Sequence, residues 1–260
     1  VFSPDSMHVA YNAFTGNKVV MVLDEKESKR YDGIGTTIAF SPDSKQVAFN
    51  ARMGNRWFVV LDGKEEMTYD NIMRGTPLFS PDGKRLIYGV KSGPWRFVVL
   101  DGKDEKHYES IGTPVFSQDS RQFAYAARKD GMWLVVHNTG EGRPYEEIVS
   151  VNPVFSPDSK RLAYIVQRGK KRLAVVDGKE EEEYDNIIED SLTFSPDGKH
   201  IAYMVQQANK RFAVIDGKER KESDITSLPD MGRIVFDSPD TFRYIAVKDN
   251  YIFRVEEKIE

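Results

Sequence analysis

The chain has 260 residues, of which 37 are basic and 41 acidic, and its net charge of −4 lacks the positive field that holds a nucleic-acid backbone. Hydrophobic residues make up 40%, enough for a folded core, and the absence of cysteine excludes disulfides and cysteine-bound metals. No apolar run approaches the roughly 18 residues of a membrane helix. We therefore expect neither a nucleic-acid partner nor insertion into a membrane.

A short signature recurs along the chain. Phe-Ser-Pro-Asp begins at Phe2, Phe40, Phe79, Phe155 and Phe194, a Phe-Ser-Gln-Asp variant begins at Phe116, and a distorted Phe-Asp-Ser-Pro-Asp begins at Phe236. The copies lie about 39 residues apart, a regularity typical of repeat architectures. An Asp-Gly pair and then a Tyr-Asp or Tyr-Glu pair follow most signatures, so the whole unit repeats.

Each repeat is predicted to hold four short strands. In the second repeat, apolar runs rich in β-branched and aromatic residues cover 37–41, 46–52, 56–61 and 67–70, with turn residues between them. Four strands of this length leave no room for a helix, and radial closure of the repeats would shield their edges. We predict an all-β fold, a seven-bladed β-propeller of four-stranded antiparallel blades, as a single domain over residues 1–260.

Two runs carry a resemblance to a known family. The runs from Phe155 to Tyr164 and from Phe194 to Tyr203 read Phe-Ser-Pro-Asp-Ser/Gly-Lys-x-x-Ala-Tyr. This pattern resembles the WD-like propeller repeat of TolB-type proteins, which also occurs in the propeller domains of the prolyl oligopeptidase and dipeptidyl peptidase families. The resemblance implies a propeller fold and points toward the periplasm or the cell exterior. Such repeats serve as scaffold, partner-binding surface or enzyme gate in different proteins.

The seventh repeat departs from the pattern. Asp237 is inserted in its signature, Phe242 and Tyr244 are out of register with earlier repeats, and the third strand is expected to end near Val255 with no fourth strand after it. Because Val1 already lies inside a signature, we expect an upstream segment to supply the missing outer strand. In an alternative role, the open edge of this last blade would pair with another copy of the chain.

Residues that could carry catalysis or bind a metal are scattered. The signature aspartates follow proline in a turn pattern, in which aspartate bonds the backbone two residues on, so we assign them a structural role. The four histidines have no metal-binding spacing, although His8 and His200 share one repeat position. We therefore expect no catalytic residue, no metal site and no cofactor, and predict that the chain is not an enzyme.

The candidate binding residues lie at the starts of the third strands. All three tryptophans fall there, together with four arginines: Trp57, Trp95, Trp133, Arg56, Arg96, Arg172 and Arg211. Tryptophan and arginine are enriched at interaction hot spots, so we predict a non-catalytic scaffold that binds a protein or peptide through this rim. In the alternative interpretation, the tryptophans cap packing between blades and the arginines pair with acidic side chains.

Variable segments precede the first strands on the same face, at 33–36, 71–76, 148–152, 187–191 and 225–231, where a repeat scaffold carries its specificity. A rival prediction makes the chain the gating propeller of a larger peptidase, or a binder of small molecules in a central channel. That channel would be lined by hydroxyls and amides, which are poor general bases: Thr37, Thr76, Thr113, Asn152 and Ser191. We expect the acidic run 180–183 between the third and fourth strands of its repeat, as a charged edge.

Overall fold

The computed structural model describes residues 1–149, 152–225, 233–248 and 251–259. Every regular element in these ranges is a β-strand, and neighbouring strands pair antiparallel, so the predicted all-β class is confirmed. Within the same ranges, no helix is long and apolar enough to cross a membrane. The chain divides into two compact units, Val1–Gly131 and Met132–Glu260, which are described one at a time.

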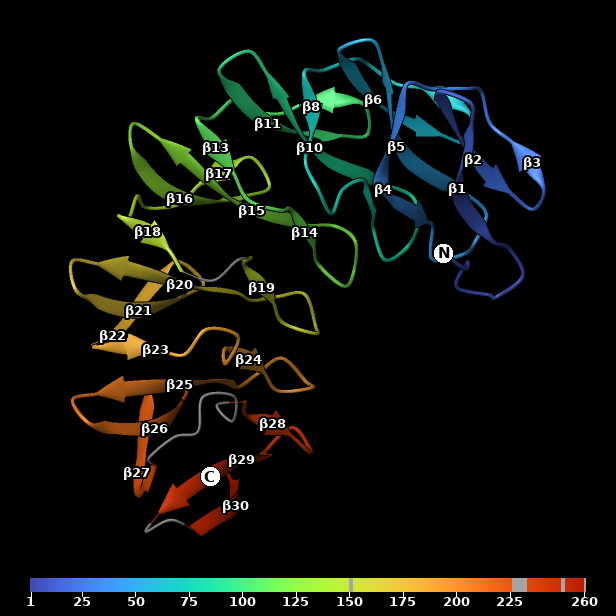
Figure 1. Cartoon of the computed structure of the whole chain (residues 1–260). Coiled ribbons are helices and arrows are strands. Elements are labelled where there is room, and N and C mark those ends of the chain that lie inside the picture. Colours follow the sequence, from blue (N-terminus) through green and yellow to red (C-terminus); the bar gives the residue numbers. More distant parts are fainter. Residues whose placement is uncertain (150–151, 226–232, 249–250, 260) are drawn as a thin grey trace. The chain divides into compact units, whose positions relative to one another are not determined.

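The first unit contains β1 to β15 (Figure 1). Its first sheet has the order β1 (Ala10–Thr15), β2 (Lys18–Leu23), β3 (Lys26–Glu27), and its second has the order β4 (Gly33–Phe40), β5 (Val47–Met53), β6 (Arg56–Leu61), β7 (Lys64–Glu65). In the third, β8 (Asn71–Ile72) and β9 (Leu78–Phe79) both pair with β10 (Leu86–Ser92), followed by β11 (Trp95–Leu100) and β12 (Lys103–Asp104). The last elements are β13 (Ser110–Ile111) and β14 (Val115–Phe116), both paired with β15 (Phe123–Lys129).

The second unit begins with the paired strands β16 (Met132–His137) and β17 (Gly140–Glu141). Two sheets repeat the pattern: β18 (Glu147–Ile148), β19 (Val154–Phe155), β20 (Leu162–Arg168), β21 (Lys171–Val176), β22 (Lys179–Tyr184), and then β23 (Asn186–Ile187), β24 (Thr193–Phe194), β25 (Ile201–Gln207), β26 (Lys210–Ile215), β27 (Lys218–Ile225). The final sheet has the order β28 (Val235–Phe236), β29 (Thr241–Lys248), β30 (Tyr251–Lys258).

Two predicted boundaries in the repeat are corrected. The fourth strand of the second repeat is β7 at 64–65, directly after the Asp-Gly turn, whereas the predicted segment 67–70 contributes only a bridge between Tyr69 and Trp57. The variable segment 71–76 is also not a loop throughout, because Asn71 and Ile72 form β8 and pair with β10. The first strand of this sheet is therefore split into β8 and β9, and the variable segment contains β8 and part of the stretch between the two.

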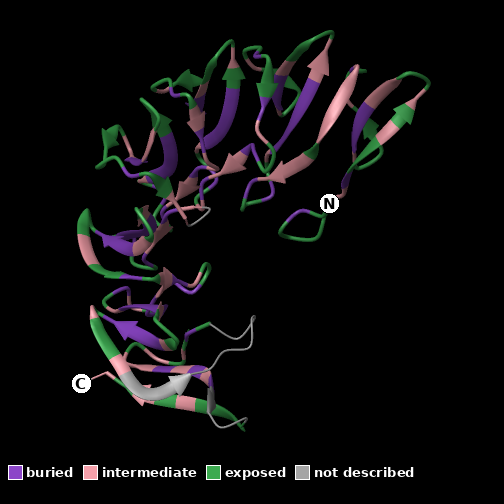
Figure 2. Cartoon of the chain, turned by 60° about the vertical axis from the view of Figure 1, so that its left-hand side comes forward, coloured by how far each residue is buried: buried purple, intermediate pink, exposed green. Residues whose placement is uncertain are grey.

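Neighbouring sheets bury both faces of the second and third strands (Figure 2). In the second sheet, Phe49 and its face pack against Met21 of the first sheet, while Val59 on the other face packs against Tyr88 of the third. Consecutive residues of β5 are therefore apolar, as expected for a strand covered on both sides. Each sheet depends on its neighbours for its core.

A tyrosine of the repeated Tyr-Asp or Tyr-Glu pair closes these interfaces. The Tyr69 ring meets Phe97 edge-on, with centroids 5.8 Å apart, and its hydroxyl donates to Asp104 Oδ1 at 2.8 Å. The second unit repeats the polar contact, since the Tyr145 hydroxyl donates to Glu180 Oε1 at 2.9 Å. A buried ring with a satisfied hydroxyl combines packing with orientation.

Each signature folds into a turn that serine and aspartate stabilise. Ser41 Oγ donates to Asp43 Oδ1 at 2.7 Å and accepts the Gln46 N–H at 2.9 Å, while the Lys45 N–H donates to Asp43 Oδ1 at 3.2 Å. The serine–aspartate bond recurs in further repeats, at Ser80, Ser117, Ser156 and Ser195. The structural role predicted for the signature aspartates is confirmed.

The Asp-Gly pairs form the predicted hairpin turns between third and fourth strands. Asp62 and Gly63 have φ angles of 49° and 82°, the left-handed region that this two-residue turn requires. The aspartate has a second task, because Asp62 Oδ1 accepts the Val47 N–H at 2.9 Å. The end of the third strand is thereby fixed to the start of the second.

The last sheet and the acidic run lie at sheet edges. β28, β29 and β30 form a three-stranded sheet, in which the third strand runs to Lys258 and does not end near Val255 as predicted. The acidic run 180–183 forms a charged edge, as predicted, but it lies within the fourth strand β22 and not between the third and fourth strands. Its charge is partly compensated, since Glu180 Oε1 accepts from the Arg168 guanidinium at 2.6 Å.

Replacing the signature serine should destabilise the fold measurably. Ser41→Ala leaves the Gln46 N–H without its acceptor in a partly buried turn, at a cost of about 1 kcal/mol in the free energy of unfolding. Urea denaturation measures this cost. The control is Ser92→Ala in β10, expected to change stability by less than about 0.5 kcal/mol. Equal effects of the two substitutions would contradict the role of the signature serine.

Candidate functional site

Two kinds of hollow occur between neighbouring sheets of the first unit, at opposite ends of the strands. One, of about 400 Å³, lies beside the signature turns of the first two repeats, and a second of this kind, of about 290 Å³, lies beside the next signature turn. The other kind, of about 410 Å³, is lined by residues 34–37, residues 71–74, Asn50 and Trp57, and is called the Asn50 hollow below. The two kinds differ sharply in charge and in how their polar groups are paired.

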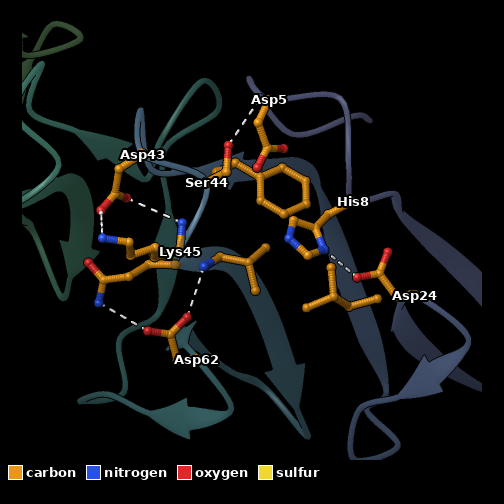
Figure 3. Close-up of a pocket in the computed structure, with 11 residues that line it drawn as sticks. Asp5, His8, Asp24, Asp43, Ser44, Lys45 and Asp62 are labelled. Carbon is orange, nitrogen blue, oxygen red and sulfur yellow. Dashed lines mark hydrogen bonds and ion pairs between the residues drawn. The ribbon is translucent and has the colours of Figure 1, made fainter.

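The hollow beside the first signature turns is lined by groups that stabilise the repeats (Figure 3). His8 Nδ1 lies 2.5 Å from Asp24 Oδ2, and Asp24 Oδ1 accepts the Val9 N–H. In the matching pair one repeat on, Gln46 Nε2 donates to Asp62 Oδ2 at 3.0 Å. These side chains hold the second strand to the hairpin that follows the third, so we assign this hollow to the scaffold.

The histidine at this repeat position makes the same kind of contact in a second repeat. His200 Nδ1 lies 2.6 Å from Asp216 Oδ2, and Arg161 Nε donates to Asp177 Oδ2 at 3.0 Å from the same repeat position. The shared position of His8 and His200 therefore serves strand pairing. Among the residues that the structure describes, no group of three or more histidine, aspartate or glutamate side chains could hold a metal ion.

The Asn50 hollow owes its shape to a bulge in the first strand of the second sheet. Ile34 pairs with Ala51 and Ile38 with Phe49, so the three residues 35–37 lie opposite Asn50 alone. Gly35 is needed for this close approach, because a Cβ there would lie 3.1 Å from Asn50 Cβ. The bulge leaves room that the next sheet lines with residues 71–74.

Asn50 is the buried polar group of this hollow. Its side chain is 5% exposed, and Asn50 Nδ2 donates to the Thr76 carbonyl at 2.7 Å. Its Oδ1 atom is buried and has no hydrogen-bond partner within the described residues. An unpaired buried acceptor costs about 1–3 kcal/mol, so a ligand or water that donates to it would relieve that cost.

The repeat position of Asn50 marks it as unusual. The same position holds apolar residues in four later repeats: Gly89, Ala126, Ile165 and Met204. In the third sheet the corresponding space is filled, since a Cβ on Gly89 would lie 2.4 Å from Met73 Sδ. Only the first repeat also has an asparagine there, Asn12, whose Nδ2 donates to the Gly35 carbonyl at 3.2 Å.

Arg74 supplies the charge of the hollow. It is the one ionisable side chain among the lining residues, and it is exposed. Within the described part of the chain, its guanidinium takes part in no hydrogen bond or ion pair. The sequence pattern indicated Arg74 only as part of the variable segment 71–76. The asparagine at position 50, in a column that is apolar in the later repeats, is the signal that could have identified Asn50.

The tryptophans all begin third strands, as predicted, but they do not occupy one position. Trp57 lines the hollow and packs against the interface between the second and third sheets, with the Arg52 guanidinium 5.9 Å from its ring centre. Trp95 is one position earlier in its strand, so it points to the other face, and it is 47% exposed. In the second unit, Trp133 pairs with Tyr145 and is half-buried.

The predicted arginines are engaged within the chain. Arg56 is ion-paired with Asp70, and Arg96 donates to the Glu109 carbonyl at 2.7 Å. In the second unit, Arg172 contacts Glu189 at 3.4 Å, and Arg211 Nε donates to Gln206 Oε1 at 3.2 Å. The contacts of Arg56 and Arg172 agree with the alternative interpretation that the arginines pair with acidic side chains, whereas Arg96 and Arg211 donate to a carbonyl and an amide oxygen.

Of the residues proposed to line a channel, some lie in a hollow and others are buried with internal hydrogen bonds. Thr37 lines the Asn50 hollow, but Thr76 and Ser191 are buried and donate to the carbonyls of Met73 and Ile188. Thr113 and Asn152 also have partners. Of the variable segments, 225–231 lies outside the described residues except for Ile225, as do positions 150 and 151 of the segment 148–152.

No protein-family model and no curated protein matches the chain. Similar solved structures include TolB from Acinetobacter baumannii (19% identity, TM-score 0.41, 69% of this chain and 51% of that chain) and the β-propeller domain of the Trilobed protease from Pyrococcus furiosus (13%, 0.43, 96% and 91%). A third is the β-propeller domain of Cps50 (Swd1) from Myceliophteria thermophila (10%, 0.36, 98% and 94%). The chain spans about half the length of the TolB structure.

The His8–Asp24 pair predicts a pH-dependent stability. The hydrogen bond to Asp24 raises the pKa of His8 above its usual 6.5, and the Val9 N–H and His8 lower the pKa of Asp24. The stabilisation by His8 is therefore complete below about pH 6.5 and is lost as the pH rises through the raised pKa. Thermal melts should show a larger advantage of the wild type over His8→Gln at pH 5.5 than at pH 8.5.

The matched control is Gln46→His, which introduces the same pair at the equivalent position beside Asp62. This variant should acquire a second pH-dependent contribution of the same sign. A wild-type advantage over His8→Gln that does not change with pH would contradict the assignment.

Proposed function

We propose that the chain is a non-catalytic, seven-bladed β-propeller module that binds a protein or peptide through the ends of its sheets where the third strands begin. The seven signature-led repeats and the interdependent sheets support the blade assignment. The Asn50 hollow is the observation that supports binding at this end. It offers an aromatic wall, Trp57, and one cation, Arg74.

Among the residues predicted to bind at this end, the tryptophans are better placed than the arginines. Four of the predicted arginines already have partners in the chain, so binding through them would have to break existing contacts. Trp57 faces a hollow, and Trp95 is nearly half exposed without needing to move. Large aromatic side chains in and beside a hollow are the usual anchors of a peptide interface.

A volume of about 410 Å³ suits a short segment of a partner rather than a broad flat contact. The hollow would take one or two side chains, and the surrounding strand ends would contact the rest. Such an interface needs no cofactor. The bulge that forms it is built into the ladder between β4 and β5, so the hollow is preformed.

Selection of peptides from a display library on the intact chain tests this proposal. Peptides that bind should lose at least tenfold in affinity on Trp57→Ala, because the aromatic wall of the hollow is removed. Lys84→Ala, at a signature turn toward the other end of the strands, is the control and should bind as the wild type. Selected peptides that bind equally well to the Trp57→Ala, Trp95→Ala and Trp133→Ala variants would refute this assignment of the binding face.

A further inference from the structure

We propose that the open edge of β1, formed by the backbone of Asn12 and Phe14, binds an extended segment of another polypeptide by strand addition. The segment has the chemistry of an aromatic residue, an acidic residue, any residue and then an aliphatic residue. The site shares no residue with the Asn50 hollow, so this inference goes beyond the proposed function and does not depend on it.

β1 is an edge strand, whereas its counterparts in the next five sheets have a partner on both sides. One side of β1 pairs with β2, and on the other side the described chain reaches only to Ala10, whose N–H donates to the Val1 carbonyl at 2.9 Å. Because alternate residues of an antiparallel strand point their backbone groups to the same side, those of Asn12 and Phe14 point to the open side. Within the described residues no strand pairs with them there.

The next five sheets show what occupies this edge. In each, the segment that begins with the acid of a Tyr-Asp or Tyr-Glu pair lies against the second strand, at 32–34, 70–72, 109–111, 146–148 and 185–187. The Asp70 N–H, for example, donates to the carbonyl of Lys91, the counterpart of Phe14, at 2.9 Å. Ile72 lies opposite the counterpart of Ala13. The edge of β1 therefore presents the backbone groups that are occupied in the later sheets.

The acidic side chain of each segment caps the hairpin between the second and third strands. Asp32 accepts the Gly54 N–H at 2.6 Å, and the same contact recurs in four further sheets, at Gly93, Gly131, Gly169 and Ala208. Gly16 is the counterpart in the first sheet, and its φ of 64° is close to the 59° of Gly54. No carboxylate of the described chain accepts the Gly16 N–H. The acid of a bound segment would supply that acceptor.

Tyr11 provides the contact for the aromatic residue. The residue at its repeat position is at most 5% exposed in the next five sheets: Phe49, Tyr88, Tyr125, Tyr164 and Tyr203. In the first three of these sheets the tyrosine of the segment meets that ring edge-on, as Tyr31 meets Phe49 with ring centroids 6.0 Å apart. Tyr11 is 49% exposed. A tyrosine that precedes the acid of the bound segment would cover it.

Another polypeptide is the source that fits this edge. The five segments of this chemistry in the described chain are each paired within a sheet, and a second copy of the chain offers the same segments in the same paired state. An unpaired segment of a partner has its backbone groups free. Addition of a strand to an exposed edge then supplies the hydrogen bonds, and the acid and the tyrosine supply the specificity.

The test uses the intact 15N-labelled chain and the peptide acetyl-Tyr-Asp-Asn-Ile-Ile-amide, which has the sequence of residues 184–188. Without peptide, the N–H groups of Asn12 and Phe14 should exchange with solvent as exposed amides do. Saturating peptide should slow their exchange at least about fivefold and shift the Gly16 N–H signal, because a bonded N–H exchanges only when its bond opens. A peptide with asparagine in place of the aspartate should need at least about tenfold higher concentrations, because it lacks the charge-assisted bond.

Two substitutions of Phe14 provide the matched pair of variants. Phe14→Pro removes the N–H and places the proline ring on the open side of β1, where no bond to β2 is lost, so it should abolish binding of the peptide. Phe14→Ala keeps the N–H and removes a side chain that is 83% exposed, so it should bind the peptide as the wild type does. Both variants should keep the dispersed spectrum of the folded chain.

Four outcomes would overturn the inference. Slow exchange of the Asn12 and Phe14 N–H groups in the free chain would mean that the edge is already paired. Exchange that the peptide leaves unchanged, equal midpoints for the aspartate and asparagine peptides, or equal binding by the two Phe14 variants would each remove the proposed recognition. Library-selected peptides that depend on Trp57 can coexist with any of these results, so the proposed function is tested separately.

Discussion

The structure depends on small sheets, such as the second, whose two faces are both buried by the sheets on either side. A blade of three or four short strands cannot bury its own apolar residues, and β5 is buried on consecutive positions because another sheet lies on either side. Phe49 faces Met21 of one neighbour while Val59 faces Tyr88 of the other. The polar turns then fix the order and spacing of the sheets. The Asp82 N–H, for example, donates to Ser120 Oγ of the next repeat at 2.9 Å.

Because polar turns fix the order and spacing of the sheets, most polar residues of the repeat have a structural role. Polar residues without such a role are therefore candidates for binding. The signature serines and aspartates, the hairpin aspartates and the His8 column all have partners set by the repeat. The Asn50 hollow departs from this pattern, because a bulge in β4 widens the space beside the buried Asn50 amide. In the third sheet the equivalent space, beside Gly89, is filled by the Met73 side chain. Residues whose polar groups are bonded within the scaffold carry little information about binding. Asn50 Oδ1 and the Arg74 guanidinium, in contrast, have no hydrogen-bond partner within the described chain.

Periodicity and turn chemistry predicted much of the fold, because both are local. The signature turns, the Asp-Gly hairpins and the positions of the tryptophans at the starts of third strands could all be predicted from single repeats. The fourth strand was misplaced because β7 is made by Lys64 and Glu65, whose backbone pairs while their side chains give no apolar signal. The isolation of Arg74 depends on which sheets meet, which no single repeat encodes. Asn50 was visible in principle, as an asparagine in a column that is apolar in the later repeats.

The most direct test of this account is a crystal structure of the chain in which ordered solvent can be placed. The account predicts ordered solvent in an open Asn50 hollow, next to Trp57 and Arg74. A hollow closed by the side chains of Met73 and Trp57 would contradict it, because the scaffold would then be complete without a ligand.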